Sequence, residues 1–282
     1  MITEARIPPT LSVSIVLHNS SPDQLRITLR SLMASVVALH DQLREPVALT
    51  ILDNCSEPEY RDQLAQLLSE LEVKDAPAVD LSVRHSNENL GFGGGHNLVY
   101  EDRPGRYFLI LNPDVELAAD ALYEGLRYLE ANAGVVALNP YCERTDGSRE
   151  YLCKRYPTAF DLLLRGLPFS SLRQIFSGRL ARYEYRDLEH AAPGSVTLLS
   201  GACLLCRGGS FAGAGRFDER YFMYFEDFDL SRRLAVEGQL MFLPTMRIVH
   251  QGGFAAKKGM QHIRWFTRSA LRFFSIHGWR LL

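Results

Sequence analysis

Short apolar segments alternate with longer amphipathic segments along the first half of the chain. Residues 11–18, 47–52 and 107–111 are nearly continuous apolar runs, which is the pattern of strands buried on both faces. Residues 24–40 and 57–71 place leucine and valine three or four positions apart, which predicts helices with one buried face. This order predicts an α/β fold, in which helices cover both faces of a mostly parallel sheet.

The alternation continues to residue 138 and then becomes irregular. Further strands are expected at residues 79–83 and 135–138, a glycine-rich turn at 90–95 and a helix at 117–131. Residues 140–194 fit neither period. The remaining expected elements are a strand at 196–205, a helix that begins near the acidic residues 226–229 and ends at Gly238, strands at 239–243 and 247–250, and an amphipathic C-terminal helix at 260–277.

Charge is spread unevenly along the 282 residues. The formal net charge is -2, so no overall positive field would recruit nucleic acid. A hydrophobic content of 46% suits a globular domain with a sizeable core. No acidic residue follows Glu237, although seven basic residues do, and this asymmetry reflects either an anionic partner or chance.

The cysteines and the N-terminal residues bear on the compartment. Five cysteines in a chain of this length do not make a disulfide scaffold. Cys203 and Cys206 have the spacing of a metal or redox motif, but residues three apart on a strand point to opposite faces and cannot share one ion. The chain starts without a signal-like segment and has no apolar run of about 20 residues. We therefore expect a cytoplasmic protein.

Three acids, Glu226, Asp227 and Asp229, lie in a strongly aromatic stretch at an expected helix start. Burial among aromatic side chains raises the pKa of a carboxyl group toward that of a general base. The helix dipole also favours negative charge here, so the same acids could cap the helix or pair with Arg232 and Arg233. Taken alone, the stretch does not decide between a catalytic base and a structural role.

Polar side chains follow several of the expected strands. Ligands of parallel sheets bind beyond the carboxyl ends of the strands, so Asp53, the glycine-rich turn and Asp114 are expected to meet in one crevice. Asp53 has two interpretations. Its carboxylate could accept a hydrogen bond from the N3–H of uracil or thymine, or it could cap the next helix. Asn112 and Asp114 flank a proline and offer oxygen ligands for Mg²⁺ or Mn²⁺, unless they form only an Asx turn. His250 is a further candidate ligand, although a lone histidine is more often structural.

The glycine-rich turn is not a dinucleotide-binding fingerprint. With Gly91 and Gly93 as the first two glycines, the third position is His96, and the turn follows the third strand rather than the first. Glycines let the backbone approach a ligand closely, and adjacent glycines destabilise a loop without structural gain. We therefore favour ligand contact over an ordinary tight turn.

The expected C-terminal helix carries a basic stripe, because Arg264, Arg268 and Arg272 recur every four residues beside many aromatic residues. One interpretation is an interfacial helix that contacts anionic lipid at the inner face of the cytoplasmic membrane. The other, which we prefer, is a helix docked on the domain with a solvated basic edge.

Taken together and in this order, these residues resemble the family 2 glycosyltransferases of the GT-A fold, and among them the bacterial rhamnosyltransferase-like members. The resemblance runs from Val13 to about Gly278. The matching segments, each weak alone but strong in register, are residues 14–19, Asp53 and Asn54, residues 89–97, residues 112–114, Gly201 and Ala202, residues 217–219, residues 226–230, and His250.

The resemblance implies a domain plan. Residues 1–250 would form the GT-A catalytic domain with its Rossmann-like sheet. Within it, residues 11–138 would bind the nucleotide sugar and residues 139–250 would bind the acceptor. Residues 251–282 would add a C-terminal loop and the basic aromatic helix.

The resemblance also implies a role for each candidate residue. Asp227 would be the general base, with Glu226 the weaker candidate. Asp114 would be the last acid of a DXD-type element whose first position is here Asn112, and His250 would join it around Mg²⁺ or Mn²⁺. The implied nucleotide-sugar-binding residues are His18, Asn19, Asp53, Asn89, Gly91, Asn97, Asn112, Gly201, Lys257 and Lys258, the two lysines on a loop expected to close over the diphosphate.

The implied reaction is an inverting, metal-dependent sugar transfer in the synthesis of a bacterial cell-surface glycan such as an O-antigen or cell-wall polymer. The best match for the donor is dTDP-L-rhamnose, and for the acceptor a polysaccharide or a polyprenyl-diphosphate-linked sugar. The alternatives are a UDP-hexose-dependent transferase of the same fold and a non-catalytic nucleotide-sugar-binding module. A nucleotidyltransferase would need a basic phosphate-binding loop near the N-terminus, and residues 11–21 contain no lysine or arginine.

Overall fold

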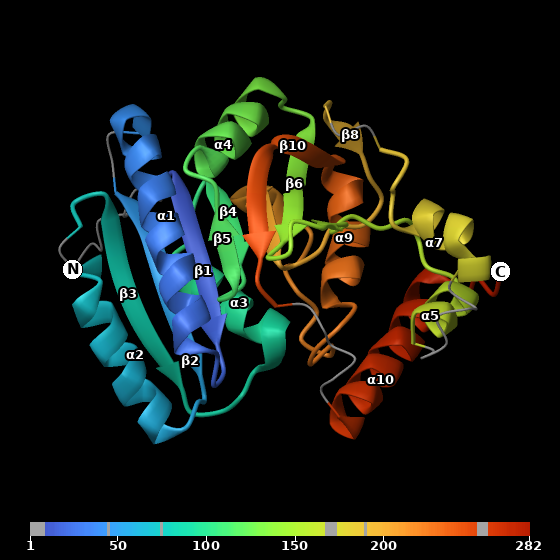
Figure 1. The fold of residues 1–282 in the computed structure, drawn as a ribbon, viewed down its shortest axis with the longest axis horizontal. Helices are drawn as coiled ribbons and strands as arrows, with labels where there is room; N and C mark the ends of the chain where they lie inside the picture. Colours follow the sequence, from blue (N-terminus) through green and yellow to red (C-terminus); the bar gives the residue numbers. More distant parts are fainter. Residues whose placement is uncertain (1–8, 44–45, 74–75, 167–173, 189–190, 253–258) are drawn as a thin grey trace.

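The structure is a computed structural model of the chain. It describes residues 9–43, 46–73, 76–166, 174–188, 191–252 and 259–282. Figure 1 shows a twisted central sheet with helices on both faces, and a C-terminal helix that lies beside the sheet rather than over it.

The first half of the chain forms a parallel layer. Its elements are β1 (Leu11–Leu17), α1 (Pro22–Leu43), β2 (Val47–Asn54), α2 (Pro58–Glu70), β3 (Val79–Ser86), α3 (Gly91–Asp102) and β4 (Tyr107–Leu111). β1 pairs in parallel with β2 and β4, and β2 pairs in parallel with β3. Each connection between these strands runs through a helix, because parallel neighbours need a long crossover.

The second half completes the sheet. Its strands are β5 (Val115–Leu117), β6 (Val135–Arg144), β7 (Arg149–Glu150), β8 (Gly194–Ser195), β9 (Cys203–Arg207) and β10 (Gln239–His250). Its helices are α4 (Ala121–Ala131), α5 (Ala159–Gly166), α7 (Ser177–Tyr183), α8 (Gly208–Gly213), α9 (Glu226–Glu237) and α10 (Met260–His277).

The strand order across the sheet is β3-β2-β1-β4-β9-β6-β10-β5, so one sheet spans both halves of the chain. β9 runs antiparallel to β4 and β6, which flank it, and β5 runs antiparallel to β10. β6 and β10 are parallel, like the strands of the first half. The expected α/β fold with a mostly parallel sheet is confirmed, with reversed strands inserted in the middle and at one edge.

Two expected elements have different bounds. The helix expected at 117–131 begins only at Ala121, because Val115 and Leu117 are buried and Glu116 is exposed in a short strand that pairs with β10. The strand expected at 196–205 is wrong over most of its length. Regular pairing starts at Cys203, and Leu198 forms an isolated bridge with Lys154.

Apolar clusters lie on the two faces of the sheet. One contains side chains of α1, α2 and α4, and the other contains side chains of α3, α8 and α9. Cys203 belongs to the first cluster and Cys206 to the second, as expected for residues three apart on a strand. Both are free, buried thiols, and they form no disulfide with each other.

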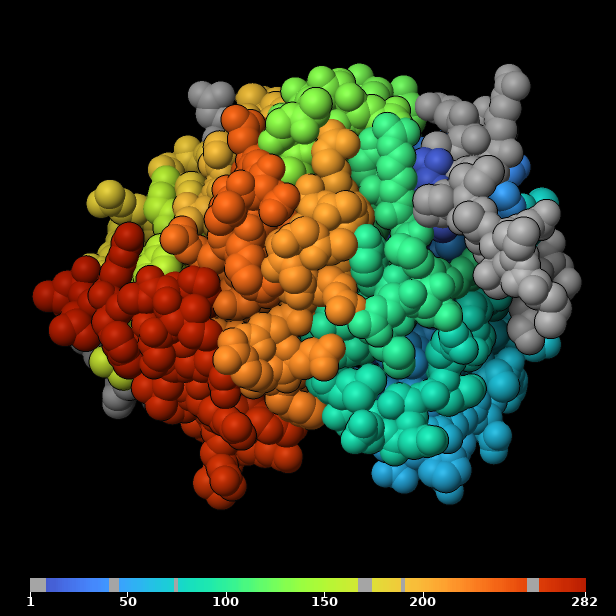
Figure 2. Space-filling view, turned by 180° about the vertical axis from the view of Figure 1, so that it is seen from behind, coloured from blue at the N-terminus to red at the C-terminus, as the bar shows by residue number. Residues whose placement is uncertain are grey.

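The C-terminal helix α10 docks on the segment that leads into α9. Phe273, Phe274 and Ala270 of α10 form a buried cluster with Tyr221 and Phe225. Figure 2 shows α10 in red against this orange segment, which separates it from the teal surface of α3. Docking of α10 on the domain is therefore confirmed, while Ile263, Leu271 and Ile276 of the same helix are exposed, so lipid contact stays a prediction. Among the described residues, no helix is both long and apolar enough to cross a bilayer.

Candidate active site

The carboxyl ends of β1 and β2 carry the first expected donor-site residues. His18 and Asn19 follow β1 and are exposed, and the register of the two strands places Asp53 beside them. His18 Nδ1 lies 3.1 Å from the carbonyl oxygen of Asn54. The Asn19 N–H donates to Ser56 Oγ at 2.9 Å. The end of β1 is thus fixed to the turn after β2, as one crevice requires.

The buried Asp53 carboxylate is held by several donors. Oδ1 accepts the N–H of Ser56 at 3.0 Å, and Oδ2 accepts Arg61 Nε at 2.6 Å and lies 3.2 Å from His85 Nδ1. Burial alone would raise the pKa of Asp53, but hydrogen bonds from Ser56, His85 and Arg61 lower it below its usual value. The carboxylate closes the turn between β2 and α2, and its contact with a pyrimidine stays a prediction.

Asn54 ties the β2 turn to the start of α3. Its Nδ2 donates to Asn89 Oδ1 at 3.1 Å and to the Gly91 carbonyl at 3.0 Å. Its Oδ1 accepts the N–H of Leu90 at 2.9 Å. Asn89 in turn accepts the N–H of Gly91 at 3.0 Å. This network positions Asn89 and Gly91 next to the β2 end, where the donor is expected.

The glycine-rich segment is the first turn of α3, so its expected loop structure is wrong. Gly91 has a positive φ of 72°, and a Cβ there would clash with the carbonyl of Phe222. A Cβ on Gly93 would lie 2.7 Å from Phe217, and one on Gly95 would lie 2.7 Å from Val16. The glycines therefore allow close packing of α3 against β1 and the segment before α9, a gain that sequence reasoning missed.

Asn97 connects α3 to that same segment. Its Nδ2 donates to the Phe217 carbonyl and to Glu219 Oε1, both at 2.9 Å. Its Oδ1 accepts the N–H of Phe217 at 3.0 Å. Asn97 is buried, and these bonds satisfy both the nitrogen and the oxygen of its amide. If Asn97 helps to frame the donor, it does so by positioning the segment before α9.

Asp114 and His250 lie side by side where β5 pairs with β10. β5, which begins after Asp114, pairs with the end of β10, where His250 lies. His250 Nε2 is 3.3 Å from Asp114 Oδ1, and His250 Nδ1 is 3.3 Å from Glu150 Oε2. Burial alone would lower the pKa of His250, but these two carboxylates raise it to about 9. A Cβ on Gly252 would clash with Asp114 Oδ2, so only glycine fits against this carboxylate.

These residues fit a divalent metal ion. Asp114 Oδ1 is buried, and its 3.3 Å contact with His250 Nε2 is an ion pair that lacks hydrogen-bond geometry, so among the described residues this oxygen has no well-formed hydrogen bond. Carboxylate and imidazole suit Mn²⁺ or Mg²⁺, and a carboxylate behind the other ring nitrogen is the usual second-shell arrangement. The described part of the chain holds no cluster of three or more such ligands. A metal here would therefore take its remaining ligands from water and substrate phosphates.

Asn112 precedes this pair at the end of β4. Its N–H donates to the Ala202 carbonyl at 2.9 Å, which ties the loop to the start of β9. The carbonyl of Pro113 accepts Thr28 Oγ1 at 2.9 Å, which fixes the same loop to α1. The position expected for a DXD-type element is thus held by the neighbouring strand and by α1.

Asp227 lies in the first turn of α9 and is half-buried. Its Oδ2 accepts the N–H of Gly201 at 3.1 Å, and its Oδ1 accepts the N–H of Phe228 at 2.9 Å. A Cβ on Gly201 would lie 2.8 Å from the ring of Phe92, so Gly201 fits between Phe92 and Asp227. Burial raises the pKa of Asp227 to about 6, although the bonds from Gly201 and Phe228 lower it. This pKa suits a general base near neutral pH.

Glu226 has a different environment. It is buried, and its Oε2 has no hydrogen-bond partner among the described residues. Burial, and then the charge of Asp227, raise its pKa well above the usual value. Tyr224 and Phe225, directly before it, both have positive φ, at 69° and 64°. Such backbone strain in consecutive non-glycine residues is typical of functional sites.

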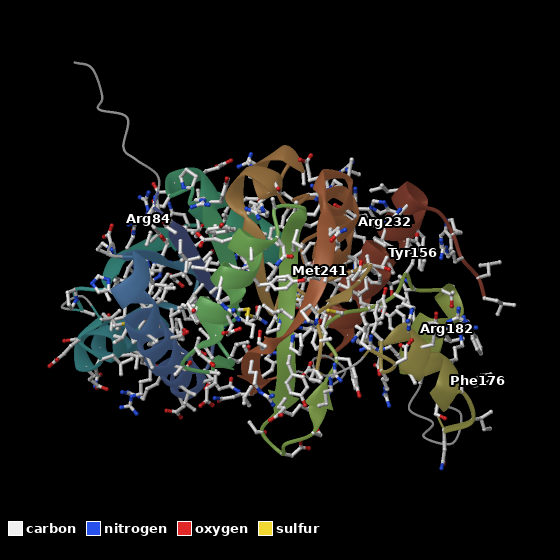
Figure 3. The ribbon with its side chains drawn as sticks, turned by 90° about the horizontal axis from the view of Figure 1, so that it is seen from above. Arg84, Tyr156, Phe176, Arg182, Arg232 and Met241 are labelled. Atoms are coloured by element: carbon white, nitrogen blue, oxygen red, sulfur yellow. The ribbon has the colours of Figure 1, made fainter. Side chains whose placement is uncertain are left out.

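Asp229 is structural, but it is not the expected helix cap. Its Oδ2 pairs with Arg233 at 2.7 Å, and its Oδ1 lies 2.7 Å from His277 Nε2 at the end of α10. Arg232 does not join this pair; its guanidinium lies 5.8 Å from the ring centroid of Tyr156 (Figure 3). Asp229 therefore fastens α10 to α9.

Sequence reasoning missed Asn139 and Lys154, both buried. The Asn139 side chain donates to the carbonyls of Ser200 and Cys203 and accepts the Ser200 N–H at 2.7 Å, which fixes the loop containing Gly201. Burial lowers the pKa of Lys154 to about 8, and its charge contributes to lowering the pKa of Asp227. Of these two residues, only Asn139 could have been singled out from the sequence, because it is a polar residue inside an apolar strand. Lys257 and Lys258 lie outside the described residues.

Comparison with known proteins agrees with this geometry. The model of glycosyl transferase family 2 matches residues 12–211. The chain therefore belongs to glycosyl transferase family 2, and it is a glycosyltransferase.

Two curated relatives are rhamnosyltransferases. An N-acetylglucosaminyl-diphospho-decaprenol L-rhamnosyltransferase of Mycobacterium tuberculosis is 34% identical over 151 residues, which cover 51% of this chain and 46% of that protein. Rhamnosyltransferase WbbL of Escherichia coli is 26% identical over 196 residues, which cover 65% of this chain and 69% of that protein. The match thus spans about half the length of the mycobacterial relative.

Solved structures share the GT-A fold. GalNAc-T7 with UDP, GalNAc and Mn²⁺ superposes with a TM-score of 0.66 at 15% identity, covering 96% of this chain and 48% of that one. Mannosyltransferase PcManGT from Pyrobaculum calidifontis, with GDP-Man and Mn²⁺, superposes with a TM-score of 0.59 at 15% identity, covering 95% of this chain and 65% of that one.

Proposed function

We propose that the protein transfers L-rhamnose from dTDP-L-rhamnose to a hydroxyl of a polyprenyl-diphosphate-linked sugar, with inversion at the anomeric carbon. The observation that carries the proposal is Asp227, a half-buried carboxylate that two backbone N–H groups orient and that burial brings to a pKa of about 6. The rhamnosyl donor and the diphosphate-linked acceptor are supported by the names of the two curated relatives.

Each group of residues has one part in this reaction. Asp53 accepts the N3–H of the thymine, and the network of Asn54, Asn89 and Gly91 shapes the wall beside it. Asp227 accepts the proton of the acceptor hydroxyl, whose oxygen forms a bond to the anomeric carbon. The bond from that carbon to the diphosphate breaks on the opposite face, so one displacement inverts the configuration.

Asp114 and His250 are the residues that would hold a divalent metal, with Glu150 orienting the imidazole. A bound metal would supply charge neutralisation for the leaving diphosphate. The contact of Asp114 Oδ1 with the His250 imidazole, in place of a well-formed hydrogen bond among the described residues, supports this assignment. The choice between Mn²⁺ and Mg²⁺ is left to the experiment.

A panel of donors tests the proposal. The protein, with Mn²⁺ or Mg²⁺, is incubated with N-acetylglucosaminyl-diphospho-lipid acceptor and dTDP-L-rhamnose, UDP-hexoses or GDP-mannose, and the product is identified by mass spectrometry. Rhamnose incorporation from dTDP-L-rhamnose is expected. Preferred use of a UDP-hexose would replace the donor assignment, and donor binding without any transfer would favour the non-catalytic alternative.

A further inference from the structure

A hollow of about 420 Å³ lies between the segment before α9 and the middle of α10. Its walls carry three arginines, Arg220, Arg268 and Arg272, and two aromatic side chains, Phe222 and Trp265. The two aromatic rings pack with their centroids 4.8 Å apart. None of the described donor-site residues lines this hollow, so it is a separate site.

Arg268 and Arg272 carry charge that the protein leaves unmatched. They lie four residues apart on α10, which places them on one side of the helix. Neither forms an ion pair with any residue that the structure describes, and the guanidinium of Arg272 lies 5.8 Å from the ring centroid of Tyr221. Two unmatched guanidinium groups at one hollow favour an anionic ligand, and their planar forks suit phosphate oxygens.

The other charged groups at this hollow are already satisfied. Arg220 pairs with Asp218 through Nη2 at 2.6 Å and Nε at 2.8 Å. Glu219 Oε1 accepts Asn97 Nδ2 at 2.9 Å. The charge of Arg220 is therefore largely cancelled by Asp218, whereas Glu219 keeps its negative charge because its partner is a neutral amide. The two arginines on α10 outweigh this one carboxylate, so the hollow keeps a net positive charge.

The hollow is also built directly onto the segment that carries the base. Ser269 Oγ donates to the Met223 carbonyl at 2.9 Å, so α10 is fixed beside this segment. The Phe222 carbonyl accepts the N–H of Phe92 at 3.0 Å. The Phe92 ring borders Gly201, whose N–H holds Asp227. The wall of the hollow is thus linked to the candidate base through the contacts of Phe222, Phe92 and Gly201.

We propose that this hollow binds the diphosphate ester of the acceptor, with Arg268 and Arg272 contacting its phosphate oxygens. The inference rests on the proposed function, because that function supplies an acceptor sugar joined to a diphosphate. Phe222 and Trp265 then offer an apolar wall to the sugar or isoprenoid on either side of the charged group. Recognition of the acceptor is in this way separated from recognition of the donor diphosphate.

Binding of geranyl diphosphate tests the hollow without requiring sugar transfer. In a Trp279→Phe background, Trp265 fluorescence reports on the hollow alone, because the chain has two tryptophans. Geranyl diphosphate is expected to change this fluorescence saturably, and Arg268→Ala with Arg272→Ala to weaken binding at least tenfold. Arg280→Ala, which removes one exposed charge outside the hollow, is the matched control and is expected to leave binding unchanged.

Three further arms distinguish the sources of the anion. Inorganic pyrophosphate is expected to compete with geranyl diphosphate for the hollow. Binding of the protein to phosphatidylglycerol vesicles is not expected to depend on Arg268 or Arg272. Stabilisation by dTDP-L-rhamnose in a thermal shift is expected to be the same in the double variant and in the parent. If the double variant binds geranyl diphosphate within twofold of the parent, or loses donor affinity equally, the proposal is overturned.

The two proposals fail in different ways. Absence of transfer from every donor would reject the proposed function, while arginine-dependent binding of geranyl diphosphate would still establish the anion site. Conversely, rhamnose transfer with unaltered acceptor KM in the double variant would reject the anion site and leave the transferase assignment intact. Transfer to octyl N-acetylglucosaminide, which has no phosphate, is expected to be unaffected by both substitutions.

Discussion

The backbone N–H of Gly201 donates a hydrogen bond to Asp227, with the nitrogen 3.1 Å from Oδ2. This bond joins the loop before β9 to the first turn of α9, and it leaves the carboxylate half-buried. Asn139 fixes the loop from the other side. The position of the candidate base is therefore set by the sheet and not by its own helix alone.

Asp227→Asn is expected to abolish proton acceptance while keeping the shape of the site. The turnover number should fall about 100- to 10,000-fold, the usual worth of a general base. The affinity for dTDP-L-rhamnose, measured by thermal shift, should stay unchanged. Glu226→Gln is the matched comparison, because it makes the same carboxyl-to-amide change at the neighbouring buried position and keeps the shape of the side chain. Full activity of Asp227→Asn would reassign the base.

Activity is expected to fall on the acid side of pH 6. The base must be ionised, and burial raises the pKa of Asp227 to about 6. As the pH drops below that value, kcat/KM should decline about tenfold per unit, whereas it should be level from pH 7 to 8. A profile that stays level down to pH 5 would contradict the assignment.

The same shift predicts a dependence of stability on pH. The folded protein binds the Asp227 proton more tightly than the unfolded chain, whose carboxyl has a pKa near 3.8. The contribution of this group to the free energy of unfolding is thus largest below about pH 4 and is lost as the pH rises through 6. The free energy of unfolding of the parent and of Asp227→Asn can be measured with urea between pH 4 and 7. The difference between the two proteins should become smaller as the pH falls.

Removal of divalent metal is expected to stop transfer. EDTA should inactivate the enzyme, and Mn²⁺ or Mg²⁺ should restore it. Glu150→Gln should weaken metal binding about 10- to 100-fold, because Glu150 orients His250 without being a ligand itself. Calorimetric titration measures this affinity, and the exposed Glu116→Gln on β5 is the control. Equal metal affinities of Glu150→Gln and Glu116→Gln would show that Glu150 does not support metal binding through His250.

Gly95→Ala separates packing from ligand contact in the first turn of α3. A Cβ at this position lies 2.7 Å from Val16, so overpacking should cost about 1–3 kcal/mol of unfolding free energy. Gly209→Ala on α8 is the control, because nothing lies within 4 Å of its Cβ. Donor affinity of the folded Gly95→Ala protein is expected to match the parent. A large loss of donor affinity at full stability would restore the ligand-contact interpretation.

Local periodicity was enough to predict the order of strands and helices in the first half of the chain. It placed Asp53, Asp114 and the glycines beyond strand ends, and the structure brings these positions to the same side of the sheet. The direction of β9 was not predictable, because buried parallel and antiparallel strands have the same apolar pattern. The helical structure of residues 91–95 was also not predicted, because it depends on close packing with residues far away in sequence.

The charged pairs show the same limit. His277 is the partner of Asp229 across 48 residues, and Glu150 is the partner of His250 across 100. Nothing near Asp229 in the sequence distinguishes an ion pair with α10 from a helix cap. Such pairs become visible only after the chain has been folded into its final topology.

The insertion of β10 between β6 and β5 has a consequence for synthesis on the ribosome. The donor half of the sheet can assemble while the chain is still emerging, because β1 to β4 are neighbours in sequence. β5, by contrast, must wait for β10, and only then does His250 reach Asp114. A nascent chain is therefore unable to complete this pair until β10 has been translated, so the two proposed metal ligands come together only late in synthesis.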